Sequence, residues 1–213
     1  MGLVELRKER DETKVGIWKM EETIDQLKKS LILNAAEIRY FSTLNKGKRN
    51  MHWVAGRVLL RHVLETDHFI KVEGDIHGKP QLLNFDFEMS ISHSADYAAV
   101  AISKKKVGID IEEIKPVIKK ICSKFMSEKE ISEVPDGEHE IEQLYVYWCT
   151  KESIFKLNGK KQLHFREHIH IDGFAYKGEG YIKAHIKQND FEQSFDVRYE
   201  KYDGYMLTYV IDE

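Results

Sequence analysis

The stretch VGIDIEE, from Val107 to Glu113, alternates apolar and acidic residues in a strand-like run. Because side chains along a strand point to opposite faces in turn, Asp110 and Glu112 are predicted to share one face, while Glu113 turns away from it. Two carboxylates this close repel each other unless a cation lies between them. The residues alone allow two interpretations: the hydrated face of an ordinary strand, or a site for a hard cation such as Mg²⁺, which prefers oxygen ligands.

A second informative stretch is IEQLYVYWCTKESIFKL, residues 141–157, whose apolar residues recur at helical spacing. Glu152 lies at the edge of this apolar stripe and Lys156 follows one turn later. As a surface pair the two would contribute only about 0.2–0.5 kcal/mol. Lys151 falls near the centre of the stripe, so either its stem extends to solvent or its ammonium is needed inside a cleft.

The regions on either side of VGIDIEE repeat a similar order of elements. Helices are predicted at 20–31 and 48–65 and two strands at 85–103, and further helices and strands follow Pro116. YAAVAIS, near the end of the first half, is weakly similar to YMLTYVI, near the end of the second. This order predicts an α+β fold built from a duplicated unit.

Residues that suit a phosphate lie in the first half. The segment SISHS (90–94) combines serines with His93, and the turn HGKP (77–80) offers Lys79. Arg49, Arg57 and Arg61 fall on one flank of the predicted helix 48–65, where the simpler interpretation is a solvated basic surface.

Composition limits the possible classes of function. The chain has 213 residues, with 33 basic and 36 acidic side chains and a net charge of −3. A general nucleic-acid binder would carry a basic excess. Cys122 and Cys149 form neither a disulfide framework nor a zinc cluster. Since there is no signal-peptide core and no apolar run of membrane-spanning length, we expect a reduced, cytoplasmic protein without a nucleic-acid or membrane partner.

Taken in order, five motifs resemble the 4′-phosphopantetheinyl transferases: HGKP (77–80), SISHS (90–94), VGIDIEE (107–113), FMSEKE (125–130) and WCTKESIFKLNGK (148–160). The length resembles the Sfp-type branch, in which one chain holds two similar halves. The resemblance implies two similar α/β halves related by pseudo-two-fold symmetry, each a small antiparallel sheet packed with helices. It also implies a coenzyme A-binding half at 1–105 and a metal-binding, catalytic half at 106–213, with the active site between the halves.

The family transfers the 4′-phosphopantetheine arm of coenzyme A to a serine of an apo acyl or peptidyl carrier protein and releases adenosine 3′,5′-bisphosphate. The resemblance implies the same Mg²⁺-dependent activity here, in a monomer. It implies that Asp110, Glu112 and Glu152 hold Mg²⁺ against the coenzyme A pyrophosphate. Glu152 would also act as the base, and Lys156 would stabilise the leaving phosphate or donate a proton.

By the same resemblance, coenzyme A is expected to contact Lys79, Ser92 and His93, with Ser90 and Lys151 in support. Ser90 stands where the family usually has asparagine. The coenzyme A 3′-phosphate would be held by a basic cluster of the first half, whose candidates are Lys46, Lys48, Arg49 and Arg57.

A carrier protein is expected to dock on the region 115–135, unless this region packs on its own core instead. The candidate contacts are Ile118, Lys119, Lys120, Lys124, Phe125 and Met126. Two other classes of function stay open. One is a non-catalytic scaffold for carrier proteins or coenzyme A, which the presence of all three acids disfavours. The other is a Mg²⁺-dependent nucleotide hydrolase that uses the same acids with water as nucleophile.

Overall fold

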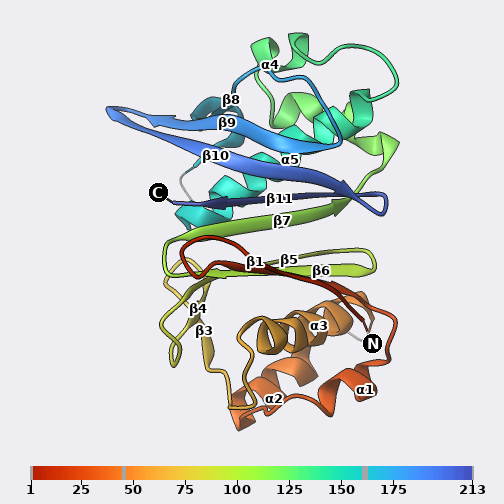
Figure 1. Cartoon of the computed structure of the whole chain (residues 1–213), viewed down its shortest axis with the longest axis vertical. Coiled ribbons are helices and arrows are strands. Elements are labelled where there is room, and N and C mark those ends of the chain that lie inside the picture. Colours follow the sequence, from red (N-terminus) through yellow and green to blue (C-terminus); the bar gives the residue numbers. More distant parts are fainter. Residues whose placement is uncertain (1, 45–46, 160–162, 213) are drawn as a thin grey trace. The chain divides into compact units, whose positions relative to one another are not determined.

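The computed structural model describes residues 2–44, 47–159 and 163–212 (Figure 1). The chain divides after Lys104 into two compact units. Each unit has an antiparallel sheet and its own hydrophobic core.

The first unit is a four-stranded antiparallel sheet with helices packed against it (Figure 1). The sheet order is β1 (Leu3–Lys8), β2 (Lys14–Lys19), β6 (Tyr97–Ser103) and β5 (Glu88–Ser94). The helices are α1 (Ile24–Lys28), α2 (Ala35–Thr43) and α3 (Lys48–Val63), and a small hairpin joins β3 (Val72–Gly74) to β4 (Pro80–Leu82).

Helix α3 is the centre of the first core. Its residues Val54, Val58 and Leu59 are buried against the sheet, where each contributes about 1.5–3 kcal/mol by leaving water. Gly16 of β2 allows the close approach, because a Cβ there would lie 2.5 Å from a methyl carbon of Val63. The predicted helix at 48–65 and the two strands within 85–103 are therefore confirmed.

The second unit is a five-stranded antiparallel sheet crossed by one long helix (Figure 1). The sheet order is β7 (Val107–Glu113), β11 (Tyr205–Ile211), β10 (Phe191–Tyr202), β9 (Glu179–Gln188) and β8 (Ile169–Ile171). The long helix is α5 (Glu140–Asn158), and the short ones are η1 (Pro116–Lys120), η2 (Cys122–Lys124), α4 (Glu128–Ser132) and α6 (Phe165–His168).

Gly108 of β7 fixes how closely α5 crosses the sheet. A Cβ at this position would lie 1.9 Å from the Ser153 carbonyl oxygen and 2.9 Å from the Leu157 nitrogen, both in α5. The Ser153 hydroxyl, for its part, donates to the Thr208 carbonyl of β11 at 3.1 Å and lies 2.6 Å from the Thr208 hydroxyl. The close approach at Gly108 and the contact between the Ser153 and Thr208 hydroxyls together fix the position of α5 over β7 and β11.

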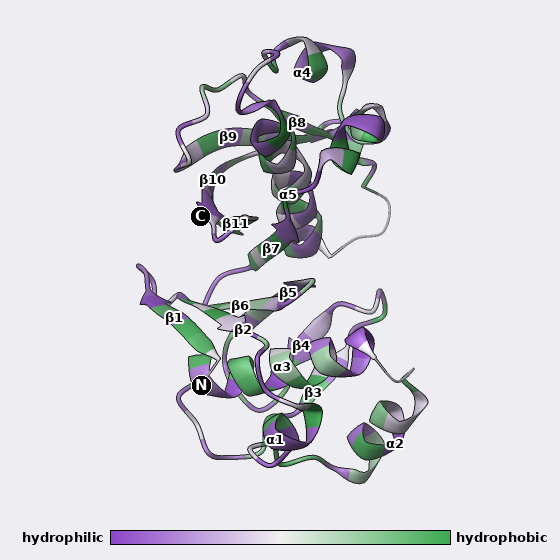
Figure 2. Ribbon diagram, turned by 90° about the vertical axis from the view of Figure 1, so that its right-hand side faces the viewer, coloured by the Kyte–Doolittle hydropathy of each residue, from purple (hydrophilic) through white to green (hydrophobic). Residues whose placement is uncertain are grey.

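The prediction of an α+β fold with small antiparallel sheets and helices is confirmed. The pseudo-two-fold relation between the halves stays a prediction. Hydrophobic and hydrophilic residues are mixed along α5 (Figure 2), and this helix is buried around most of its circumference, with five consecutive buried residues from Gln143 to Tyr147. Within the described ranges, no helix combines the length and the apolar character that crossing a membrane requires.

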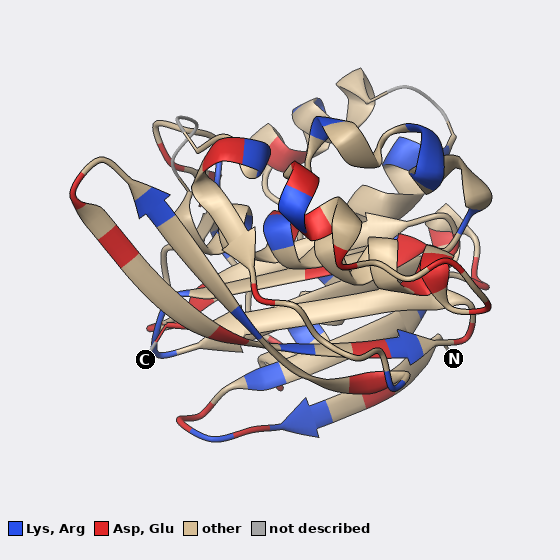
Figure 3. Ribbon diagram, turned by 90° about the horizontal axis from the view of Figure 1, so that it is seen from above, with Lys and Arg blue, Asp and Glu red and all other residues tan. Residues whose placement is uncertain are grey.

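Charged residues of both signs are interspersed along the strands and helices (Figure 3). This distribution follows from the near balance of 33 basic and 36 acidic residues. A charged partner would therefore be recognised by a local group of side chains and not by the field of the whole chain.

Candidate active site

Acidic residues of β7 lie under α5 and not on a hydrated face. Asp110 is 2% exposed, and Glu112 is partly buried. In the β7–β11 ladder, Asp110 stands opposite Thr208, the residue that holds Ser153 of α5. Of the two interpretations that the sequence left open, the fully hydrated strand face does not fit this burial.

Lys156 of α5 neutralises Asp110. Its ammonium donates to the Asp110 Oδ1 at 2.6 Å and to the Ile109 carbonyl at 3.2 Å. The Asp110 side chain is almost fully buried, so this charge-assisted bond is stronger than a surface pair. The structure therefore brings together two of the predicted catalytic and metal-binding residues, on a strand and a helix that Gly108 holds in contact.

Glu152 lies one helical turn before Lys156. Burial, followed by the negative charge of Asp110, raises the pKa of the Glu152 carboxyl to about 7; Lys156 opposes this shift and Glu112 adds to it. A carboxyl group with such a pKa exchanges its proton near neutral pH, as general acid–base catalysis requires. Strongly shifted pKa values also gather at functional sites, although structural ion pairs produce them too.

The predicted Mg²⁺ ligands fit the ion by donor type and by charge. Asp110, Glu112 and Glu152 offer only carboxylate oxygens, which Mg²⁺ prefers, and their mutual repulsion favours a cation. Across the described parts of the chain, however, no three His, Cys, Asp or Glu side chains already stand as a ready metal site. The ammonium of Lys156 lies against Asp110 instead. The Mg²⁺ assignment stays a prediction, and it requires these side chains to rearrange.

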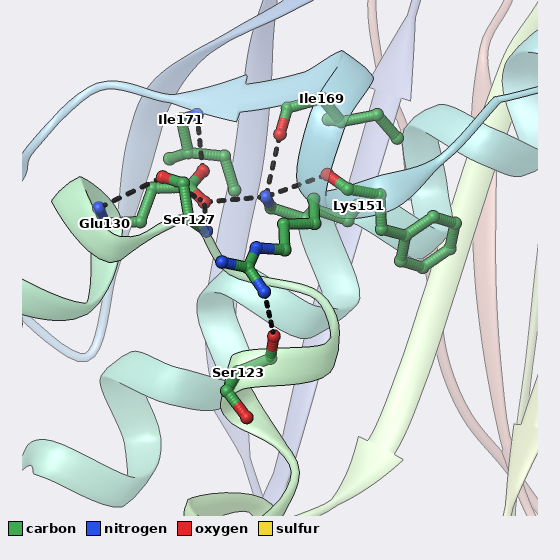
Figure 4. A network of polar contacts seen from close by, with 8 residues as sticks. Ser123, Ser127, Glu130, Lys151, Ile169 and Ile171 are labelled. Atoms are coloured by element: carbon green, nitrogen blue, oxygen red, sulfur yellow. Dashed lines mark hydrogen bonds and ion pairs between the residues drawn. The ribbon is translucent and has the colours of Figure 1, made fainter.

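Lys151 is buried in a network of polar contacts (Figure 4). Its ammonium donates to the Glu130 carboxylate at 2.8 Å, to the Ile169 carbonyl at 2.7 Å and to the Phe165 carbonyl at 3.1 Å. The second oxygen of Glu130 accepts from the Ile171 nitrogen at 3.0 Å. All three ammonium donors thus have acceptors. This placement favours a structural role, tying α5 to α4, α6 and β8, over the predicted contact with coenzyme A.

The first unit contains a cavity of about 570 Å³ between α2, α3, β5 and the β3–β4 hairpin. Its lining includes Tyr40, His52, Trp53, Arg57, Pro80 and His93. Two predicted coenzyme A contacts, Arg57 and His93, therefore share one cavity. Lys79 lies between two lining residues, Gly78 and Pro80, and its backbone closes the turn by exchanging hydrogen bonds with Asp75.

Strand alternation separates the serines of SISHS from its histidine. β5 contributes Ile91 and His93 to the cavity lining. Ser90 and Ser92 point to the other face of the strand, where they are 3% and 5% exposed. Of the three residues grouped in this segment, the structure brings only His93 to the cavity.

The predicted 3′-phosphate cluster is dispersed. Lys46 lies outside the described residues, and Lys48 and Arg49 are exposed on the first turn of α3, apart from the described residues that line the cavity. The Arg57 guanidinium lies 3.6 Å from the centroid of the Trp53 ring and 3.6 Å from a Glu37 carboxylate oxygen. Burial lowers the pKa of Arg57, and Glu37 opposes that shift. Only Arg57 of the four candidates is shown at the cavity.

Sequence reasoning missed His52, because the basic residues considered were lysines and arginines. A signal was present in the helical spacing: residues 52, 53, 56, 57 and 60 fall on one face of α3, and all five line the cavity. This shared face of the helix groups His52 with Arg57.

Part of the predicted carrier-protein surface belongs to the core of the second unit. Ile118, Phe125 and Met126 are at most 2% exposed and pack in the hydrophobic cluster under α5. They were wrong as docking contacts, because Ile118 of η1 and the two residues that follow η2, Phe125 and Met126, turn into this core. Lys119 pairs with Glu140 at 2.7 Å, while Lys120 and Lys124 are exposed.

Comparison with known proteins agrees with the site on β7 and α5. Residues 106–210 match the model of the 4′-phosphopantetheinyl transferase superfamily. The chain is 34% identical over 113 residues to 4′-phosphopantetheinyl transferase psf-1 of Bacillus pumilus, a match covering 49% of this chain and 48% of that protein. It is 32% identical over 113 residues to Sfp of Bacillus subtilis (strain 168), covering 49% and 50%. With AcpT of Escherichia coli (strain K12) it shares 34% identity over 121 residues, covering 54% and 60%.

The chain thus spans about half the length of the curated relatives it matches, and the matched part contains β7 and α5. Residues 106–210 include both parts of this site: the strand with Asp110 and Glu112, and the helix with Glu152 and Lys156. On these matches, residues 106–210 of the chain belong to the 4′-phosphopantetheinyl transferase superfamily, with relatives of the Sfp type.

Proposed function

We propose that this chain transfers the 4′-phosphopantetheine arm of coenzyme A to a serine hydroxyl of an apo carrier protein and releases adenosine 3′,5′-bisphosphate. The observation that carries the proposal is Glu152, a carboxyl group with a pKa of about 7, next to the ion pair of the buried Asp110 and the partly exposed Lys156. A base that titrates near neutral pH and a fixed ammonium are the two groups that this phosphoryl-type transfer needs.

In the proposed reaction, the serine oxygen forms a bond to the β-phosphorus of coenzyme A as the bond to the departing phosphate breaks. Glu152 takes the serine proton, directly or through water. Lys156 donates hydrogen bonds to the departing phosphate oxygens, on which the electron pair remains. Mg²⁺, held by Asp110, Glu112 and Glu152 when bound, would supply further charge stabilisation for the phosphate oxygens.

The first unit is proposed to bind coenzyme A. Its cavity of about 570 Å³ lies within the range of about 300–1,000 Å³ that small-molecule sites occupy. His93 offers an imidazole for a phosphate, and the ring of Trp53 with the guanidinium of Arg57 above it offers flat surfaces for a base. Lys79 remains a candidate contact through its place in the turn that precedes Pro80.

The carrier protein is proposed to dock near η1 and η2. Val117 of η1 is 52% exposed, and Lys120 of η1 and Lys124 of η2 are exposed as well. One apolar and two basic side chains suit a partner that presents an apolar residue among acidic ones. A cytoplasmic location and a monomeric state are further proposals, the first in line with the free thiols of Cys122 and Cys149.

The test is to incubate the protein with coenzyme A, Mg²⁺ and a panel of apo carrier proteins, with intact-mass measurement of each carrier. We expect at least one carrier to gain the mass of one phosphopantetheine arm. Absence of this gain on every carrier would overturn the proposal. Release of adenosine bisphosphate without a carrier would favour a nucleotide hydrolase, and carrier or coenzyme A binding without transfer would favour a scaffold.

A further inference from the structure

Two histidines from different elements meet at the cavity of the first unit. The ring of His52, from α3, is stacked on the ring of His93, from β5, with centroids 4.2 Å apart and an interplanar angle of 18°. Both residues line the cavity. One face of the His93 ring is therefore covered by His52, and this contact restricts the rotamers open to His93.

The orientation of His52 is itself fixed. Its Nε2 lies 2.9 Å from the Ala95 carbonyl oxygen, and since a carbonyl only accepts, Nε2 carries the hydrogen. Ala95 belongs to the turn between β5 and β6, two residues after His93, and its φ of 46° is in the left-handed region that alanine rarely occupies. The hydrogen bond thus ties α3 to the same turn that ends the strand carrying His93.

We infer that His52 is a positioning residue, which holds the His93 ring in the orientation that donates a hydrogen bond to a phosphate of coenzyme A. This inference rests on the proposed function. His52 uses its Nε2 hydrogen within the protein, whereas the His93 ring is exposed and lines the cavity. A donor whose rotamer is already fixed loses less conformational entropy when the ligand binds.

Another histidine of α3 provides a matched control. His62 also stacks on an aromatic ring, that of Trp18, with centroids 5.2 Å apart. It belongs to the last turn of the helix and is not among the described residues that line the cavity. His62→Ala removes the same atoms from the same helix as His52→Ala, without touching the cavity.

The experiment measures coenzyme A affinity by calorimetry for the whole chain and for three variants, His52→Ala, His52→Phe and His62→Ala. We expect His52→Ala to weaken binding about five- to tenfold, the upper range for losing one aromatic contact. His52→Phe keeps a ring to stack and is expected to retain most of the affinity. His62→Ala should bind like the unaltered protein. In the transfer assay, His52→Ala should raise the KM for coenzyme A and leave kcat nearly unchanged.

A structural readout accompanies the affinities: the ring resonances of His93 in NMR spectra without ligand. They should shift in His52→Ala, because the stacked ring is lost, and much less in His62→Ala. Any one of three outcomes would overturn the inference. The His93 resonances could stay unchanged in His52→Ala, or His52→Ala could bind coenzyme A as tightly as the unaltered protein. The third outcome is an equal loss of coenzyme A affinity in His52→Ala and His62→Ala. If the unaltered protein binds coenzyme A and no carrier is modified, the proposed transfer fails while the role of His52 in binding stands. If it does not bind coenzyme A, both fail.

Discussion

The pair of Lys151 and Glu130 yields the sharpest prediction about stability. Both side chains are buried, with 0% and 3% exposure. Lys151→Met removes the ammonium and leaves the Glu130 carboxylate buried without its counter-charge. Breaking such a pair costs about 3–5 kcal/mol. We expect the lower end of that range, because Glu130 still accepts hydrogen bonds from the backbone nitrogens of Ser127 and Ile171.

A loss of about 3 kcal/mol is a large share of the 5–15 kcal/mol that stabilises an ordinary domain. It should lower the Tm of the second unit by roughly 10 °C or more. The assay is unfolding in guanidinium chloride, followed by tryptophan fluorescence, because Trp148 of α5 stacks edge-on against Phe125 in the affected core.

A double variant, Lys151→Met with Glu130→Gln, removes both charges and should recover part of the lost free energy of unfolding. The recovery is incomplete, since the Phe165 and Ile169 carbonyls lose their donor. Lys129→Met is the surface control: the Lys129 side chain is 82% exposed and pairs with Glu133, so we expect a change within about 0.5 kcal/mol. A Lys151→Met protein as stable as this control, or one that loses only coenzyme A affinity, would refute the structural role.

Three further predictions concern β7 and α5. Gly108→Ala should destabilise the second unit by about 3 kcal/mol or more in denaturant unfolding, because its Cβ would meet the Ser153 carbonyl oxygen. A variant as stable as the unaltered protein would mean that α5 does not cross β7 so closely. Asp110→Asn should lower the transfer rate at least about a hundredfold while changing coenzyme A affinity little, as followed by carrier mass and calorimetry. In metal-free protein, the folded pKa of Glu152, about 7, exceeds the usual 4.5, so its contribution to stability is complete below about pH 4.5 and is lost as the pH rises through 7. That loss should amount to about 3 kcal/mol and should be absent from Glu152→Gln; a pH dependence shared by both proteins would contradict the assignment.

The sequence predicted the elements that carry the β7–α5 site, because their periodicities are strong. The alternation of VGIDIEE predicted strand β7, and the apolar stripe of residues 141–157 predicted helix α5. The sequence could not predict how deeply the acidic side chains of this site are buried. Asp110 reads as a polar strand residue, and it is buried only because Gly108 allows a helix to cross above it.

Some predicted coenzyme A contacts lie away from the cavity or in another network, and the physical causes are related. Ser90 and Ser92 lie within three residues of His93 in sequence, yet the pleat of β5 turns them to the opposite face. Lys151 looks like a ligand contact until its acceptors, all distant in sequence, are known. Such outcomes depend on which elements pack together, and local patterns do not contain that information.

The ladder of β7 and β11 has a consequence for biosynthesis. β7 pairs with β11, the last strand of the described residues, which follows roughly ninety residues later. At about 5–20 residues per second, the ribosome exposes Val107–Glu113 for roughly 5–20 s before the partner strand exists. During that interval the strand is an open edge that can pair with other chains. Its buried acid, Asp110, is then a charge that discourages such pairing, so the residue proposed for chemistry would also protect the nascent chain from aggregation.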